Sequence, residues 1–398
     1  MTRMFKRFTL FLLTICLTSC QKDPNQSSIP TLIVDIDNVT EAKLSDYFES
    51  IDYVWMEDES TEDASIGVMH RLISHRDKFY IFDEDICICF YIFSDKGDFI
   101  RKVRGYGDGP GSYMYPSSFQ VVQDTIRLVD ISQRKILSYD LDGNWLYDAK
   151  LRSPALEVFV DTKGNEFYYA ASYLSTDIMN QVQVYDQVGT LNFEGFPFRG
   201  TFEEIKTINR EPFIEINERV VFLEQYADTL FLLKNEKSEP FLLFDFLKKG
   251  FTESDLNQIK DYEPLEYLDY LNNRIPLYFL GMAVGNQRHF LGYFQYRNNH
   301  YLGIYDFEKT SGSVFKSGII NDLDQGKVIH GLSNLNDSSV YAWTTGRDLY
   351  KHVQHLRSKM TDQTWETFVK GEGYKLVSTA NRAKNSENRV LMILKWKK

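Results

Sequence analysis

The stretch that decides the fold is Leu137–Leu146, which reads Leu-Ser-Tyr-Asp-Leu-Asp-Gly-Asn-Trp-Leu. Its Asp-x-x-Gly centre provides a turn with a side-chain acceptor and with a glycine that can adopt a positive φ. The aromatic residues on either side are placed to pack across two adjacent strands. The stretch is therefore predicted to be a β-hairpin, and Tyr91–Ile100 and Val184–Leu191 share its design.

A strand-like apolar segment precedes each hairpin, so a two-part unit recurs along the chain. Six segments of this kind are present: Lys78–Asp83, Thr125–Asp130, Glu166–Tyr169, Val220–Leu223, His289–Tyr293 and Ser339–Trp343. Leu302–Asp306 and Arg389–Leu394 are less regular second members of later units. From Ile66 onward the units average about 55 residues, longer than the roughly 40 to 45 of a compact WD-type blade, so loops or insertions must absorb the excess.

Repeats of four strands favour radially arranged blades, because an open sheet of about twenty-four strands would leave bare edges. A parallel solenoid is the competing architecture, but its repeats would be shorter and more even. The predicted fold class is all-β, a six-bladed β-propeller. The ring is expected to close by pairing of Tyr53–Glu57 with the C-terminal strand at Val390–Trp396.

A short helical insertion is expected in the fourth unit, which holds the largest insertion, over one end of the propeller. Thr252–Asp255 has the pattern of a helix-capping box. Apolar residues then continue at helical spacing as far as Pro276, namely Leu256, Ile259, Leu265, Leu268 and Leu271.

The N-terminus has the pattern of a lipoprotein export signal. Arg3, Lys6 and Arg7 precede the apolar run Phe8–Leu17, and Thr18-Ser19-Cys20 follows it. A run of about ten residues is too short for the roughly twenty that a spanning helix needs. A small residue followed by cysteine is where such a signal is cut and the new N-terminal cysteine acylated, so lipidation is predicted at Cys20. An ordinary signal peptide or a short buried helix is the alternative.

The predicted organisation has three parts: a signal peptide at 1–19, a lipidated N-terminus and spacer at 20–45, and the propeller at 46–398. The polar residues from Gln21 to about Ile29 cannot bury enough surface to order themselves. Gln21 is not the aspartate that commonly signals retention in the inner membrane, so an outer-membrane lipoprotein is expected. Whether it faces the periplasm or the cell surface stays open.

Charge and composition exclude some partners. Removal of residues 1–19 takes away three basic and no acidic residues, so the net charge falls from −11 to about −14. No basic stripe with interleaved aromatic residues is present outside this segment, so no nucleic-acid partner is expected. Hydrophobic residues at 43%, with 25 Tyr and 29 Phe, supply a core for most of the chain and favour strands.

Cysteine usage indicates no disulfide framework. Once Cys16 leaves with the signal and Cys20 takes lipid, only Cys87 and Cys89 remain. Residues i and i+2 of a strand lie about 7 Å apart, beyond the usual bridging geometry, so a Cys87–Cys89 bond is not expected. A metal site would need further ligands, and His70 and His75 lie on the preceding segment without a ligand pattern.

The segment Asp95–Tyr113, together with Tyr80–Asp83 and Tyr115–Phe119, resembles the signature of six-bladed β-propeller lipoproteins of gut-type Gram-negative bacteria. The layout matches over the whole mature chain, whereas the specific motifs lie in the first two units. Those relatives carry Gly-Pro-Gly-Glu before an aromatic residue, and Ser112 occupies the acidic position here. The resemblance implies an NHL- or TolB-like propeller and implies no activity.

The glycine-rich run within this segment consists of Gly105, Gly107, Gly109, Pro110 and Gly111. Proline fixes φ and glycine permits left-handed backbone, so the run is interpreted as a structural connection between blades. The alternative is an anion-binding nest. A phosphate loop needs a Lys-Ser/Thr pair or a helix start after the glycines, and a further turn follows here instead.

No catalytic residue, metal site or cofactor is predicted. The chain contains no zinc-protease motif, nucleophile elbow or Walker loop. Ser132–Lys135 fits Ser-x-x-Lys, but it lies between two predicted strands and lacks the companion motifs, so it is interpreted as a solvated turn. Four acidic turn residues are interpreted as turn caps because no contiguous calcium loop is present: Asp83, Asp85, Asp130 and Asp140.

Two functions remain open. The favoured one is a non-enzymatic lipoprotein, held at the membrane by its lipid, that binds an envelope protein or a glycan on one face of the propeller. The alternative is a propeller enzyme, such as a lyase or a lactonase-like hydrolase. Its site would be built at the central channel from scattered residues that no linear motif reveals.

Overall fold

The computed structural model describes residues 29–170, 177–198, 211–224, 226–252, 254–255, 262, 264–273, 276–336 and 338–397. The predicted signal peptide and Cys20 lie outside the described residues. Among the helices that are described, none has the length and apolar character needed to cross a membrane.

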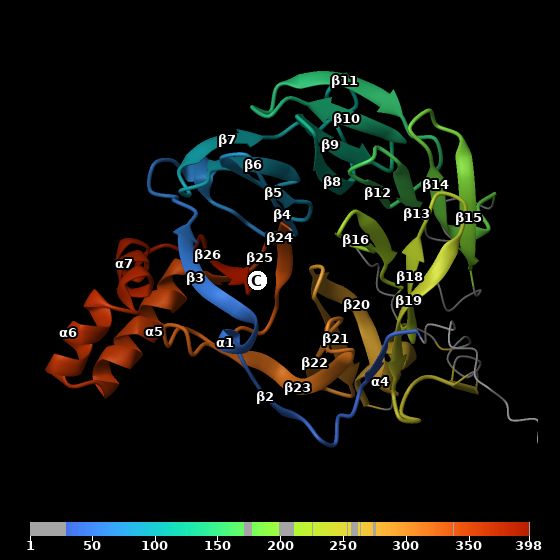
Figure 1. Ribbon diagram of the computed structural model, residues 1–398. Coiled ribbons are helices and arrows are strands. Elements are labelled where there is room, and N and C mark those ends of the chain that lie inside the picture. Colours follow the sequence, from blue (N-terminus) through green and yellow to red (C-terminus); the bar gives the residue numbers. More distant parts are fainter. Residues whose placement is uncertain are drawn as a thin grey trace, which may run out of the picture.

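Six sheets, each with four antiparallel strands, surround a common centre (Figure 1). Sheet 1 contains β4 (Arg71–His75), β5 (Lys78–Asp83), β6 (Cys89–Ser94) and β7 (Phe99–Val103). Sheet 2 contains β8 (Pro116–Val122), β9 (Thr125–Asp130), β10 (Lys135–Tyr139) and β11 (Trp145–Lys150). Sheet 3 contains β12 (Glu157–Val160), β13 (Glu166–Tyr169), β14 (Asn180–Tyr185) and β15 (Leu191–Pro197).

The second half of the chain forms the other three sheets. Sheet 4 contains β16 (Phe213–Ile216), β17 (Arg219–Phe222), β18 (Thr229–Leu233) and β19 (Ser238–Asp245). Sheet 5 contains β20 (Tyr278–Gly285), β21 (His289–Tyr296), β22 (Asn299–Asp306) and β23 (Ser311–Ile320). Sheet 6 contains β24 (Ser333–Asn336), β25 (Ser339–Thr345), β26 (Arg389–Trp396) and the early strand β3 (Phe48–Trp55).

The N-terminal segment binds to three of these sheets. β1 (Thr31–Ile33) adds in parallel to β19, and β2 (Thr40–Lys43) adds in parallel to β23. The short helix α1 (Leu44–Tyr47) then leads into β3. β3 pairs with β26, with Tyr53 opposite Met392, so the predicted closure is confirmed. The predicted domain boundary at residue 46 is too late, because β1 and β2 already belong to the sheets.

The hydrophobic core is divided among the interfaces between neighbouring sheets. Between sheets 1 and 2, Phe82 stacks on Phe119 with ring centroids 5.2 Å apart, and Phe90 meets Tyr139 edge to face at 5.3 Å. Five further clusters join the remaining pairs of adjacent sheets, including sheet 6 to sheet 1 through Tyr341. The aromatic richness of the sequence is therefore used to fill wedge-shaped spaces between sheets.

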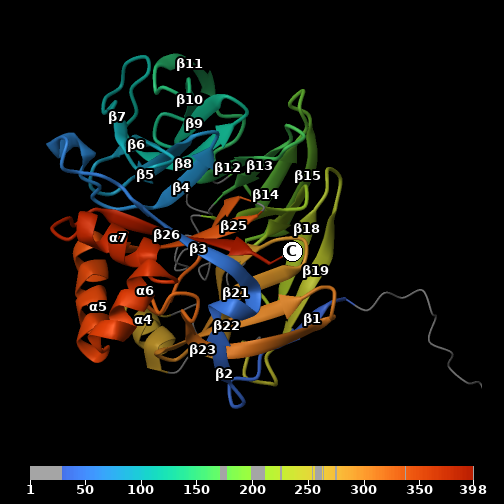
Figure 2. The same ribbon diagram turned by 60° about the vertical axis from the view of Figure 1, so that its left-hand side comes forward.

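The helices require a correction. A β-propeller is confirmed, but its predicted form, six blades of four strands with one short helical insertion in the fourth unit, is wrong. Two of the six sheets have five strands, each extended by a parallel strand from the N-terminus. The largest described helical insertion interrupts sheet 6 between β25 and β26, where α5 (Gly346–Lys359), α6 (Asp362–Lys370) and α7 (Tyr374–Arg382) lie beside the ring (Figures 1 and 2).

The insertion that was predicted is also present, in the connection from sheet 4 to sheet 5. Thr252 and Asp255 form the expected capping box, since the Asp255 amide donates to Thr252 Oγ1 at 3.2 Å and the Thr252 amide donates to the Asp255 carboxylate at 2.8 Å. Helix α4 (Pro264–Asn273) follows. Leu256 and Ile259 lie outside the described residues.

The hairpin turns have the predicted chemistry. The Asp140 carboxylate accepts hydrogen bonds from the amides of Asp142 and Asn144, at 2.9 and 2.8 Å. Gly143 has φ 78°, in the left-handed region that glycine tolerates. In the hairpin from β6 to β7 the acceptor is the Ser94 hydroxyl, one residue before the aspartate that the pattern indicates.

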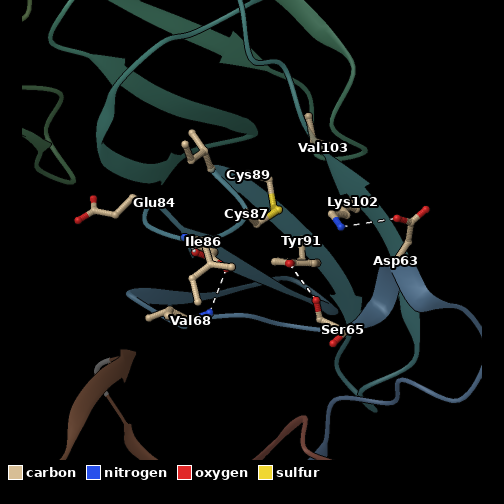
Figure 3. The surroundings of a disulfide bond; sticks show 12 residues. Asp63, Ser65, Val68, Glu84, Ile86, Cys87, Cys89, Tyr91, Lys102 and Val103 are labelled. Carbon is tan, nitrogen blue, oxygen red and sulfur yellow. Dashed lines mark hydrogen bonds and ion pairs between the residues drawn. A yellow bond between two sulfur atoms is a disulfide. The ribbon is translucent and has the colours of Figure 1, made fainter.

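Cys87 and Cys89 are joined by a disulfide bond, which corrects the sequence-based expectation (Figure 3). The expectation assumed that both residues lie on one strand. Cys87 instead precedes β6, and Ile88 adopts a left-handed conformation with φ 50°. The two Cα atoms are therefore 5.1 Å apart, within the usual range for a bridge.

Candidate functional site

The innermost strands of all six sheets line a central cavity of about 260 Å³. These strands are β4, β8, β12, β16, β20 and β24. Apolar side chains form much of the wall, including Phe119, Phe159 and Phe213. Because every sheet contributes to its wall, this cavity is a candidate site.

An arginine at the start of β4 dominates the polar part of this wall. The Arg71 guanidinium donates from Nη1 and Nη2 to the two carboxylate oxygens of Glu157, at 2.8 and 3.2 Å. Its Nε donates to Glu211 at 3.2 Å, and Nη1 also donates to the Phe119 carbonyl at 2.8 Å. The Arg71 side chain thereby connects sheets 1, 2 and 3. The Arg71–Glu157 pair therefore holds these sheets in position and also forms part of the cavity wall.

Burial and charge act in opposite directions on this pair. Burial raises the pKa of Glu157, and the guanidinium of Arg71 opposes that rise. Burial also disfavours the charge of Arg71, but Glu157 and Glu211 together raise the pKa of Arg71 above its ordinary value. Because arginine stays protonated in proteins and both oxygens of Glu157 act as acceptors, the pair is an ion pair at neutral pH.

Other polar groups in the wall bridge neighbouring sheets. The Gln120 side chain donates to the Val160 carbonyl and accepts from the Val160 amide, both at 2.8 Å. The Asn334 side chain accepts from the Gly285 amide at 3.2 Å. Amide side chains thus take over backbone pairing where one innermost strand meets the next, and this arrangement rigidifies the cavity.

The ionisable side chains of the described lining are one arginine and three glutamates: Arg71, Glu157, Glu211 and Glu215. The described lining contains no histidine, cysteine, serine or lysine. Its strongest acid–base candidates, Arg71 and Glu157, are held by each other. Glu211 has a side chain that is 49% exposed, so it presents a carboxylate to solvent at the cavity while contacting Arg71.

The glycine-rich run singled out in the sequence lies between β7 and β8, away from this lining. The carbonyls of Gly107, Gly109 and Gly111 accept hydrogen bonds from Gln133, Lys135 and Tyr139. A Cβ on Gly111, which has φ 71°, would lie 2.8 Å from the Trp145 ring. These contacts favour the structural interpretation, in which Gly105 and Pro110 belong to the same packed connection.

The loop amides that would form an anion nest are engaged as well. The Gly107 amide donates to the Tyr113 carbonyl at 3.0 Å, and the Gly111 amide faces the Asp148 carboxylate at 3.4 Å. A carboxylate therefore already occupies the position that a bound anion would take.

The other residues considered from the sequence are turn residues. Asp83 and Asp130 are buried and accept from backbone amides at the ends of β5 and β9. The Ser132 hydroxyl donates to Asp130, whereas Lys135 contacts Asp148, so Ser132 and Lys135 do not form a catalytic pair.

One cluster beside the turn after β5 has the residue types of a metal site. His70, Glu84 and Asp85 place one ligand atom each within 4.8 Å of one another. The His70 Nδ1 accepts from the Glu84 amide at 3.2 Å, and Nε2 lies 2.8 Å from the Asp85 carboxylate. Both ring nitrogens are thus used to fix the turn, which agrees with its interpretation as a cap.

The sequence did not reveal the Arg71, Glu157 and Glu211 cluster. Its only signal is a charged residue directly before apolar residues at the start of a strand, found at β4 and β12. Without a fold that brings residues 71, 157 and 211 together, these positions cannot be distinguished from ordinary strand ends.

Comparison with known proteins identifies a family and a similar fold. The model of the domain of unknown function DUF4934 matches residues 28–395. A search of curated proteins found no match. Among solved structures, a Bacteroides fragilis protein described as exported is matched over 93% of this chain and 100% of its own length, with 17% identity and a TM-score of 0.68.

Two further solved structures are less similar to this chain. A DUF4221-family member from Bacteroides vulgatus covers 88% of this chain and 97% of its own, with 9% identity and a TM-score of 0.47. A streptogramin B lyase covers 76% and 82%, with 12% identity and a TM-score of 0.37. The likeness to the B. fragilis protein is one of fold, and the two weaker ones carry no argument about activity.

Proposed function

We propose that this protein, which belongs to the DUF4934 family, is a non-enzymatic binding module of the cell envelope that takes its ligand at the central cavity. The proposal places it at the outer membrane, held by a lipid on Cys20. The export-type N-terminus and the fold shared with an exported protein support the location.

The observation that carries the proposal is the state of Arg71 and Glu157. An enzyme would use such a buried pair to transfer protons or to stabilise charge, and it would leave a donor or acceptor facing the substrate. Here Glu157 uses both oxygens on one guanidinium, and Arg71 also donates to Glu211 and to the Phe119 carbonyl. What remains is a preformed, partly aromatic cavity with a half-exposed carboxylate, which suits binding.

The test is crosslinking capture of the tagged protein from its native membranes. Wild type is compared with Ala283→Trp, which fills the cavity, and with Glu211→Lys, which reverses charge at the exposed carboxylate. Glu218→Lys, at an exposed position in the turn between β16 and β17, is the matched control for the charge change. We expect a stoichiometric partner with wild type and with the control, and loss of it with both cavity variants.

Equal capture by all four proteins would contradict a binding site in the cavity. Recovery of the propeller alone, combined with turnover of envelope glycans or lactones by the purified protein, would instead favour the lyase or lactonase alternative. The anchor is tested separately: fatty-acid labelling should be present in wild type and absent in Cys20→Ala, and labelling of both would contradict lipidation at Cys20.

A further inference from the structure

The Cys87–Cys89 disulfide closes the end of the turn between β5 and β6 (Figure 3). The two cysteines are separated by one residue. The chain entropy that a bridge removes from the unfolded state grows with the length of the loop it closes, so a loop this short adds little to global stability. The main effect of the bridge is therefore local, on the backbone of the residue between the cysteines.

That residue, Ile88, adopts a backbone conformation that its side chain disfavours. Its φ is 50°, in the left-handed region. A branched Cβ is crowded there by the neighbouring carbonyl, so this conformation is an outlier for isoleucine. In the described part of the chain, Thr310 is the only other β-branched residue with a positive φ. The bridge thus holds Ile88 in a conformation that the residue would not adopt by itself.

The carbonyl of Ile88 is an acceptor for a buried tyrosine. Tyr113 is fully buried, and its hydroxyl donates to the Ile88 carbonyl at 2.9 Å. The Val103 carbonyl lies 3.4 Å from the same hydroxyl, which makes it the weaker acceptor. Burial raises the pKa of Tyr113 to about 12, so the hydroxyl keeps its proton and acts as a donor. Rotation of Ile88 out of the left-handed region would turn its carbonyl away from Tyr113.

Tyr113 in turn anchors the glycine-rich connection between β7 and β8. Its amide donates to the Gly105 carbonyl at 2.7 Å, and its carbonyl accepts from the Gly107 amide at 3.0 Å. The connection leads directly into β8, one of the innermost strands that line the central cavity. A continuous series of contacts therefore joins the disulfide, through Ile88 and Tyr113, to this connection.

We propose that the Cys87–Cys89 disulfide is a redox-sensitive switch that sets the conformation of the glycine-rich connection. In the oxidised protein, the bridge holds Ile88 in the left-handed region and Tyr113 orders the connection. Reduction lets Ile88 relax, withdraws its carbonyl from the Tyr113 hydroxyl and loosens residues 105–113. This inference is independent of ligand binding in the central cavity.

The reductant is a dithiol, and its first target is the more accessible sulfur. Cys87 is 9% exposed, whereas Cys89 is completely buried. A thiolate of the dithiol attacks the Cys87 sulfur, which breaks the protein disulfide and releases Cys89 as a thiolate that takes up a proton. The second thiol of the reductant then attacks the mixed disulfide and releases Cys87, which is protonated in the same way. The reductant leaves as a cyclic disulfide, so two electrons have passed to the protein.

The experiment measures hydrogen exchange of the purified mature protein in its oxidised form and after treatment with dithiothreitol. Alkylation and mass spectrometry verify the oxidation state of Cys87 and Cys89. We expect the amides of Gly107 and Tyr113 to exchange at least tenfold faster in the reduced protein. The amide of Gly189, which is hydrogen-bonded in a hairpin turn of sheet 3, should exchange at the same rate in both forms.

Three variants separate the switch from a general loss of stability. Cys87→Ser/Cys89→Ser should exchange as reduced wild type does, with or without dithiothreitol. Tyr113→Phe lacks the hydroxyl that contacts Ile88, so its Gly107 amide should exchange at rates within twofold of each other in the two redox states. Tyr80→Phe is the matched control, because Tyr80 is also fully buried and its hydroxyl donates to a backbone carbonyl of sheet 2. It should keep the tenfold response.

Equal exchange of Gly107 and Tyr113 in the oxidised and reduced proteins would overturn the inference, and so would a tenfold response that persists in Tyr113→Phe. A bridge that resists dithiothreitol in the folded protein would overturn it too, because the switch could not operate. Acceleration spread evenly over all six sheets would show a global loss of stability and would likewise rule out a local switch.

Discussion

At the scale of single residues, buried charge explains the ion pair between Arg71 and Glu157 in the wall of the central cavity. Glu157 is 3% exposed and receives two hydrogen bonds from one guanidinium. Such a pair contributes little net stability over an apolar replacement, but removal of one partner leaves an uncompensated charge. Arg71 and its carboxylate partners Glu157 and Glu211 therefore depend on one another for charge compensation.

Arg71→Met is expected to lower the free energy of unfolding by about 3 to 5 kcal/mol at pH 7, because Glu157 loses its counter-charge. Burial already raises the pKa of Glu157. A raised carboxyl pKa contributes stability below the unfolded value, and this contribution is lost as pH rises through the folded value. The variant should accordingly recover stability as pH falls from 7 towards 5 in denaturant titrations.

The double variant Arg71→Met/Glu157→Gln provides the control for this prediction. It should regain part of the loss and show no recovery on acidification. A single variant as stable as wild type at pH 7 would show that the ion pair is not needed to neutralise Glu157.

His289 gives a second prediction at this scale. Its ring stacks on Trp396 and meets Tyr47 edge to face, and burial lowers its pKa while Asp306 partly opposes that shift. A lowered histidine pKa means that the unfolded chain binds the proton more readily, so stability falls as pH drops below the unfolded value of about 6.5. Denaturant titrations from pH 7.5 to 5.5 should show a shallower loss for His289→Phe than for wild type.

His355→Gln is the control, since His355 is exposed on α5. It should follow the wild-type pH profile. Identical profiles for wild type and His289→Phe would contradict a neutral, buried His289.

At the scale of elements, local patterns predicted the hairpins and missed what tertiary contacts decide. Asp-x-x-Gly turns such as Asp140–Gly143 act over four residues, so the sequence alone reveals them. The disulfide depends on the left-handed backbone at Ile88, a conformation rare for a β-branched residue. The α5–α7 insertion has helical caps at Thr345 and Thr361, but local signals of this kind do not show where an insertion interrupts a strand repeat.

The insertion is predicted to be part of the core of sheet 6. Leu349, Val353, Phe368 and Leu376 of its helices pack with Trp55 of β3, and Leu376 is fully buried. Leu376→Ala should lower the free energy of unfolding by about 2 to 5 kcal/mol, because it leaves a cavity. Thermal or denaturant unfolding measures this.

Lys351→Ala on the exposed face of α5 is the control and should stay within about 0.5 kcal/mol of wild type. A Leu376→Ala protein as stable as the control would show that the helices are an independent attachment.

At the scale of the whole molecule, closure joins residues far apart in sequence. β26 is paired with β25 on one side and with β3 on the other. The apolar repeats predicted this closure, because a ring of sheets leaves no better partner for the first strand. The Arg71 cluster could not be predicted in the same way, since it gathers residues from several sheets whose spacing in the sequence carries no signal.

Ile393→Pro should open the ring. Proline cannot donate to the ladder, and Ile393 lies in the central part of β26 opposite Asp52 and Tyr341. A loss of about 1 to 3 kcal/mol is expected from the buried hydrogen-bonding group that is left without its partner, with faster hydrogen exchange in both β3 and β4. Ile393→Val is the control, and exchange confined to β26 in the proline variant would contradict closure as a global constraint.

The central claim, that the protein binds its ligand at the central cavity, is tested most directly by site-specific photo-crosslinking in native cells. A photoreactive residue is placed at Glu211, at the cavity, and in a separate protein at Tyr147, on the exposed outer strand β11. The account predicts a discrete adduct from position 211 and none from position 147. An adduct from position 147 alone would contradict this claim and would place the binding surface on the outer strands of the blades.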